Sequence, residues 1–247
     1  MQNTDLFSSS APRQPAAFDT GLRRYLLAVY NYMSAALAMT GAIAWFATGS
    51  PAFLNAMYIM DNGQVYGTRG LAFVVMLAPL GLVILMSFGL RRMSLPALQV
   101  CYWLYAAVMG LSLSVVFLTF TGESVARMFF ITAATFGGMS LYGYSTRRDL
   151  TGFGSFLFMG LIGLIIASLV NLFLRSSGLQ FALSLIGVLV FVGLTAYDTQ
   201  KIKALYYHVT EDEDWHKKLA IMGALTLYLD FINIFLNLLN LFGDRRR

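Results

Sequence analysis

Of the 247 residues in this chain, 58% are hydrophobic and only 12% are charged. A soluble domain typically carries roughly 45–50% apolar and about 25% charged residues, so this chain has too few charges to cover a surface exposed to water on all sides. The composition excludes a soluble enzyme, a nucleic-acid-binding protein and a disordered chain, and it predicts an all-α polytopic membrane protein.

Seven apolar segments are long enough to cross a bilayer, which takes about 20 helical residues. In chain order they are 25–47, 71–90, 97–120, 126–145, 153–174, 180–205 and 219–241. We therefore expect three parts: a mobile polar tail over 1–24, a seven-helix transmembrane domain over 25–243 and a basic tail over 244–247. The single cysteine, Cys101, excludes an internal disulfide framework.

Lysine and arginine are concentrated at alternate ends of these segments. The N-terminal tail and the second, fourth and sixth loops carry most of them, whereas the first, third and fifth loops carry one arginine each. The positive-inside rule therefore places the N-terminus in the cytoplasm. Seven crossings would leave the C-terminus outside, although it reads Arg245-Arg246-Arg247. Either the last helix crosses against the rule, or it re-enters and returns its end to the cytoplasm.

Small residues recur at four-residue spacing in two of the segments. They are Ser34, Ala38 and Ala42 in the first and Ala106, Gly110 and Ser114 in the third. Such spacing lets helices approach closely in lipid, so both stripes are expected to pack against neighbouring helices.

Asp198 and Asp230 are the two acidic residues that fall within apolar segments rather than in tails, loops or span ends. A charged side chain at the centre of the bilayer costs about 2.5–3.5 kcal/mol on insertion scales, so such residues normally face a protein interior or a wet cavity and serve a function. If the sixth helix continues through Tyr207, Asp198 lies about 14 Å deep, and the two carboxyl groups can meet.

The seventh segment carries a stripe of polar and small residues spaced alternately by three and four. Its members are Gly223, Thr226, Asp230, Asn233, Asn237 and Asn240. A membrane helix cannot present such a stripe to lipid, so the seventh helix is expected to be central and enclosed by the other six. The asparagines either support the aspartates or act as hydrogen-bonding contacts between helices.

Two carboxylates in contact do not both ionise readily, so the pair is expected to share a proton near neutrality. Without that proton it becomes a hard oxygen site suited to Ca²⁺, with asparagine carbonyls and water completing the shell. Arg91, at the end of the second helix, is a candidate to pair with the aspartates and close the site.

Two segments resemble the signatures of a known family: Tyr197-Asp198-Thr199-Gln200-Lys201-Ile202 and Leu227-Tyr228-Leu229-Asp230-Phe231-Ile232-Asn233-Ile234-Phe235. They are similar to the transmembrane BAX inhibitor motif family in its bacterial branch, and segments 132–143 and 149–160 also resemble that branch. The likeness extends from about Arg23 to Gly243.

The resemblance implies a seven-helix fold and a pH-sensitive calcium leak in the bacterial inner membrane, gated by Asp198 and Asp230 and latched by Arg91. Calcium is then a transported ion rather than a cofactor, and no enzymatic activity is expected. Partners are the lipid bilayer, calcium and protons. Relatives that modulate membrane proteases or cell death leave a non-transporting regulator, with a membrane protease as partner, as the alternative.

Other membrane classes fit less well. An intramembrane aspartyl protease would match Tyr197-Asp198, but its second motif needs glycines where Leu227-Tyr228-Leu229 stands. A retinal protein needs a lysine in the seventh helix. His208 and His216, with four acidic residues between them, could bind a cation, although a solvated turn in which Thr210 and Glu213 form a capping box is the favoured interpretation.

Overall fold

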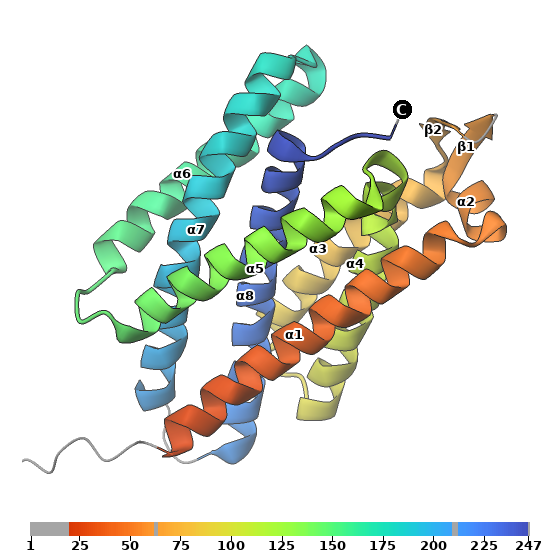
Figure 1. Cartoon of the computed structure of the whole chain (residues 1–247). Helices are drawn as coiled ribbons and strands as arrows, with labels where there is room; N and C mark the ends of the chain where they lie inside the picture. The colour runs from red at the N-terminus through yellow and green to blue at the C-terminus, as the bar shows by residue number, and fades with distance from the viewer. Residues whose placement is uncertain (1–19, 62–63, 209–211, 247) are drawn as a thin grey trace, which may run out of the picture.

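The structure is a computed structural model of the whole chain and describes residues 20–61, 64–208 and 212–246. Within these residues it contains eight helices and one β-hairpin (Figure 1). The elements are α1 (Thr20–Thr48), α2 (Pro51–Met57), β1 (Tyr58–Asp61), β2 (Gln64–Thr68), α3 (Gly70–Gly89), α4 (Leu95–Thr119), α5 (Gly122–Ser145), α6 (Thr151–Leu174), α7 (Ser177–His208) and α8 (Glu213–Phe242).

Seven of the described helices, all except α2, are long and apolar enough to span a membrane, which confirms the predicted all-α polytopic architecture. The boundaries differ at the N-terminal end of the chain and in the loop before α3. Helix α1 begins at Thr20, so Arg23 and Arg24 belong to the helix and not to the predicted tail, whose residues 1–19 lie outside the described chain. Helix α2 and the antiparallel β1–β2 hairpin fill the loop before α3 and were not predicted.

Side-chain caps account for several helix starts. The Ser94 hydroxyl accepts a hydrogen bond from Ala97 N at the start of α4. Pro96 in the same turn has no backbone N–H, so it leaves no donor unpaired there. Helix α8 is capped by Asp212, whose carboxylate accepts a hydrogen bond from Asp214 N at 3.0 Å. Thr210 of the predicted capping box lies outside the described residues.

Helix α8 is the centre of the bundle. Within its most apolar window 72% of the residues are buried, against 44% or fewer in the other six spans. It packs mainly against α1, α4, α5 and α7, while α3 lies against α4 and α6 lies against α7. The expectation of a central last helix is therefore confirmed, but α8 is enclosed mainly by four helices and not by all six, because α3 and α6 form a second layer.

Glycines permit the closest helix contacts. A Cβ added to Gly143 of α5 would lie 2.2 Å from the carbonyl oxygen of Ala196 on α7, and one added to Gly110 of α4 would lie 2.8 Å from Thr40 O on α1. These contacts bring backbones together in lipid, where packing rather than hydrophobic transfer holds helices to each other.

The two small-residue stripes have different outcomes. Ala106, Gly110 and Ser114 are fully buried where α4 meets α1 and α8, as predicted. Ser34, Ala38 and Ala42 are exposed, so the prediction that they pack against a helix is wrong. The four-residue spacing places them on one face of α1, but Ser34 and Ala38 line an open groove instead of contacting a neighbouring helix.

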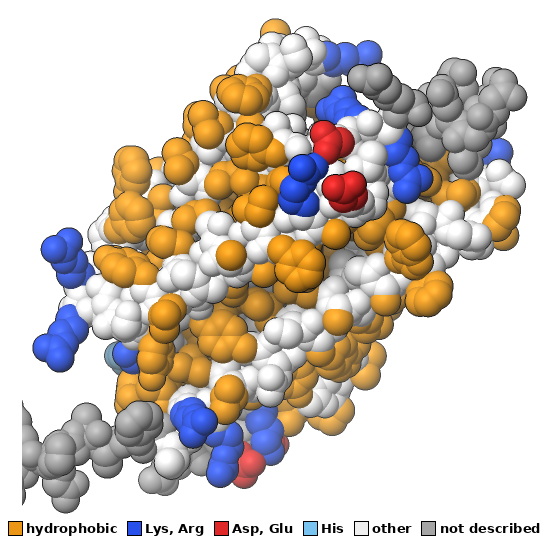
Figure 2. Space-filling view, in the orientation of Figure 1, with side chains coloured by type: hydrophobic (Ala, Val, Ile, Leu, Met, Phe, Trp, Pro, Cys, Tyr) orange, Lys and Arg blue, Asp and Glu red, His pale blue; other side chains and the backbone are white. Residues whose placement is uncertain are grey.

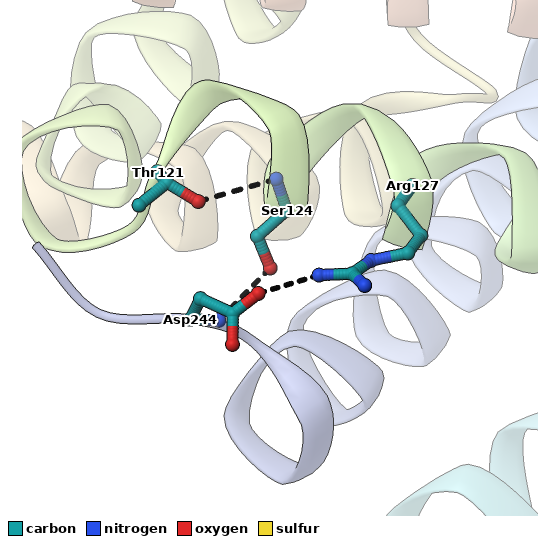
Figure 3. Close-up of polar contacts among 4 residues, drawn as sticks. All are labelled: Thr121, Ser124, Arg127 and Asp244. Atoms are coloured by element: carbon teal, nitrogen blue, oxygen red, sulfur yellow. Dashed lines mark hydrogen bonds and ion pairs between the residues drawn. The ribbon is translucent and has the colours of Figure 1, made fainter.

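The C-terminal end of α8 is tied to the turn between α4 and α5 (Figure 3). Asp244 N donates to Ser124 Oγ, Thr121 N donates to Asp244 O, and the Asp244 carboxylate forms an ion pair with Arg127. Arg246 N donates to Thr119 O at 2.9 Å. Helix α8 is one continuous helix long enough for a full crossing, and the chain after it stays at this end of the bundle.

The Gly143 contact predicts a selective loss of stability. Replacing Gly143 with Ala places a methyl group against the α7 backbone, which cannot move as a flexible side chain would, and overpacking of this kind costs about 1–3 kcal/mol. Thermal unfolding in detergent should show a midpoint lowered by several degrees. Gly163→Ala on α6 is the matched control, because nothing lies within 4 Å of its added Cβ. Equal midpoints for the two variants would contradict this account of the α5–α7 contact.

Candidate functional site

Asp198 of α7 and Asp230 of α8 face each other inside the bundle. They are 7% and 4% exposed, and their carboxyl groups lie within hydrogen-bonding reach of each other. Helix α7 continues unbroken to His208, ten residues beyond Asp198, so Asp198 lies about 15 Å from the end of the helix at 1.5 Å per residue. The long α7 is therefore what brings the two carboxyl groups to one place.

The pair is not saturated by hydrogen bonds. Asp230 Oδ2 is buried and has no hydrogen-bond donor among the described residues. A buried carboxylate oxygen without a donor is costly, which favours a proton or a cation at this position.

Lys201 is the positive charge that acts on Asp198. It follows Asp198 by three residues on α7, and its ammonium lies 5.8 Å from the ring centre of Tyr197. Tyr197 itself packs on α6, where a Cβ at Gly154 would lie 2.4 Å from its ring. Its place one turn from Asp198 gives Lys201 an electrostatic role beside the aspartates that the sequence pattern did not single out.

A chain of hydroxyl groups joins three helices and ends at Thr199, the residue after Asp198. Tyr30 Oη of α1 hydrogen-bonds to Ser140 Oγ of α5, which lies 3.1 Å from Thr199 Oγ1 of α7. Sequence analysis missed this chain, because its members are 110 and 59 residues apart and each is an ordinary hydroxyl residue in its own helix.

Arg91 is not brought to the aspartates. It is exposed in the turn after α3, which belongs to the second layer of the bundle. Among the residues that the structure describes, it forms no ion pair with Asp198 or Asp230. The latch role of Arg91 therefore remains a prediction without a contact in this conformation.

The polar stripe of α8 is bonded mostly to its own helix. Asn233 Nδ2 donates to Leu229 O and Asn237 Nδ2 to Asn233 O, both at 2.8 Å, and Thr226 Oγ1 donates to Met222 O at 3.1 Å. The alternative that Asn237 provides a hydrogen bond between helices is thus not what the structure shows.

Two members of the stripe are close to α7 or to the pair. Asn237 packs on α7, where a Cβ at Gly187 would lie 2.7 Å from its Oδ1. Asn233 follows Asp230 by three residues and is the asparagine nearest to it along α8. Asn240 is exposed. Asn233 is therefore the asparagine best placed to complete an ion site at the aspartates.

The aspartates offer two carboxylates to a cation, and the described residues contain no cluster of three or more acidic, histidine or cysteine side chains that could hold a metal ion. His208 and His216 hydrogen-bond to carbonyls of Ala204 and Asp212 four residues earlier. Two carboxylates alone supply fewer oxygens than the six to eight that Ca²⁺ prefers.

Comparison with known proteins places this architecture in a family. The family described as "Inhibitor of apoptosis-promoting Bax1" matches residues 22–247. A protein of Rickettsia prowazekii is 53% identical over 229 residues, which are 93% of each chain. The inner membrane protein YbhL of Escherichia coli K12 is 46% identical over 234 residues, which are 94% of this chain and 95% of the relative. The chain belongs to the Bax inhibitor family of integral membrane proteins.

Proposed function

We propose that this protein is a pH-sensitive calcium leak of the inner membrane, in which Asp198 and Asp230 form a proton-sharing gate. The observation that carries the proposal is the contact between these two buried carboxyl groups on adjacent helices, one of them with an oxygen that lacks a donor. Membrane proteins place paired carboxylates in their interior mainly along proton and ion pathways.

The gate follows from the charge of the pair. With one proton shared, a hydrogen bond between the carboxyl groups ties α7 to α8. When that proton leaves, two like charges face each other at low dielectric, and the helices either separate or are bridged by a cation. Calcium and protons therefore compete for the same oxygens, and calcium is favoured as the pH rises.

Lys201 and Arg91 have separate roles in this scheme. Lys201 partly offsets the negative charge at Asp198 from its own helix. Arg91 is the candidate latch, and it needs a movement of α3 to reach the pair because it is exposed in the turn after that helix. Such a movement has to change the packing of α3 against α4, where Met86 is fully buried in the core.

The proposal includes an orientation and excludes chemistry on a substrate. The N-terminus is cytoplasmic by the distribution of lysine and arginine, and the full crossing of α8 then places the C-terminus outside. The aspartates act as an ion gate and not as catalytic acids, so the protein is a transporter and not an enzyme.

The leak is directly measurable. Liposomes that hold the purified protein and a calcium dye should take up Ca²⁺ at a rate that changes with pH. The double variant Asp198→Asn, Asp230→Asn should lose the pH dependence and leak about tenfold less, because the carboxylates that bind Ca²⁺ are gone. A tenfold weaker affinity for Ca²⁺ corresponds to a loss of about 1.4 kcal/mol in binding free energy.

Asp214→Asn is the matched control, because Asp214 lies on the same helix as Asp230 but is exposed at its first turn. It should leak as the wild type does. If wild-type and double-variant liposomes are equally tight at every pH, the leak is excluded and a non-transporting regulator of a membrane protease or stress partner takes its place.

The shared proton can be observed without calcium. Infrared difference spectra at neutral pH should contain the carbonyl band of a protonated carboxylic acid, because two buried carboxyl groups in contact do not both ionise. The band should be lost on strong alkalinisation and should shift or vanish in Asp230→Asn, while Asp214→Asn leaves it unchanged. A neutral-pH spectrum without this band would mean that both carboxylates are ionised.

A further inference from the structure

A groove runs between α1 and α5 over the central helix. Figure 1 shows α1 and α5 side by side across the front of the bundle, with α8 behind them. The hollow between them has a volume of about 630 Å³, and its floor includes Phe231, the residue after Asp230. A second hollow of about 300 Å³ shares Leu37, Phe129 and Phe231 with the first and continues it toward Gly122.

The groove exists because its walls carry small side chains. Ser34 and Ala38 of α1 face Ala133 and Gly137 of α5 across it. A Cβ added at Gly137 would meet nothing within 4 Å, so the wall at this position borders open space. The exposed stripe of α1 thus forms a wall of the groove instead of a helix interface.

The groove is apolar along its length but positively charged at one end. Arg23 lines it where α1 begins, and among the described residues this guanidinium has no ion-pair partner. Tyr144 lies at the same end, and Lys203 is held there by a hydrogen bond from Nζ to Tyr144 O at 2.9 Å. Within the described part of the chain, no acidic side chain lines the hollow. The mouth therefore complements an anionic group.

We propose that this groove holds one acyl chain of an anionic phospholipid, with its phosphate at Arg23. Basic pockets between transmembrane helices are typical sites for such headgroups. The apolar walls suit the chain, and Figure 2 shows hydrophobic side chains exposed over this face, with basic and a few acidic residues gathered toward its ends.

The length of the groove fits a single leaflet. From Arg23 to Ala38 the first hollow follows fifteen residues of α1, which is about 22 Å at 1.5 Å per residue. Half of a hydrocarbon core of about 30 Å, together with the headgroup layer, has a similar depth. A chain in this position contacts Phe231 and lies beside the Tyr30–Ser140 hydrogen bond, so the lipid reaches both the central helix and the hydroxyl chain.

Photolabelling of the full-length protein tests the site. The protein is reconstituted with phosphatidylglycerol that carries a diazirine in one acyl chain, and labelled peptides are identified by mass spectrometry. Labels should concentrate on the groove walls and floor, and the yield should exceed that with the same chain on phosphatidylcholine. Gly137→Phe or Ser34→Phe, which fill the groove from opposite walls, should reduce labelling several-fold. Arg23→Gln should lower the phosphatidylglycerol yield to that of phosphatidylcholine.

Two matched variants serve as controls. Gly163→Phe adds the same bulk to an exposed position on α6 with nothing within 4 Å, and Arg92→Gln removes an exposed arginine that does not line the groove. Neither should change the labelling. Uniform labelling over α3 and α6, or labelling unaffected by both groove-filling variants, would overturn the site. A change in particle mass from dimer to monomer in Gly137→Phe, with lipid labelling intact, would make the groove an interface between two copies and also overturn it.

Discussion

Burial of two carboxyl groups at one point in an apolar bundle is the constraint on which the rest of the architecture depends. Neither aspartate can face lipid at acceptable cost, so the helices that carry them must lie inside or against the interior. This requirement puts α8 at the centre and makes α7 its closely packed neighbour. It also accounts for the length of α7, which must continue well past Asp198 to keep that residue away from the water at its end.

The residues next to the carboxyl pair fix its position in the bundle but do not cancel its charge. Lys201 supplies positive charge from the following turn, and Gly143 and Gly154 let α5 and α6 approach α7 at Ala196 and Tyr197, just before Asp198. The contact that a Cβ at Gly143 would break lies at Ala196, two residues before Asp198. The packing contact of α7 with α5 and the carboxyl group of Asp198 therefore lie within the same turn of α7, so a change in one affects the other. This is the physical basis on which a proton could alter the spacing of helices in the proposed gate.

Sequence reasoning reached the spans and the aspartates because both depend on local signals. A run of about 20 apolar residues has few alternatives to a spanning helix, and a carboxylate inside such a run stands out at once. The short α2 and the β1–β2 hairpin were missed because they are too brief to produce a periodic pattern. The stripe from Ser34 to Ala42 shows a different limit. Spacing determines which residues share a face of a helix, but only the assembled bundle determines whether that face meets a neighbour.

The same limit applies to the site. Thr199, Ser140 and Tyr30 come from three helices, and no pattern within one helix could pair them. Arg91 was matched to the aspartates by its place in the chain, and the structure leaves it exposed in the second layer. The spacing on α8 correctly placed Asn233 and Asn237 on one face, yet it could not show that their amides bond back to their own helix.

The central position of α8 also has a consequence for biosynthesis. The helix that fills the middle of the bundle is synthesised after the other six spans, so these enter the membrane before their central helix is present. Until α8 is inserted, Asp198 lacks Asp230 as its partner, and α1, α4, α5 and α7 have not formed their contacts with α8. Completion of the fold and formation of the carboxyl pair are thus a single late event. The bonds from Asp244 and Arg246 to the α4–α5 turn then hold the end of the newly arrived helix in place.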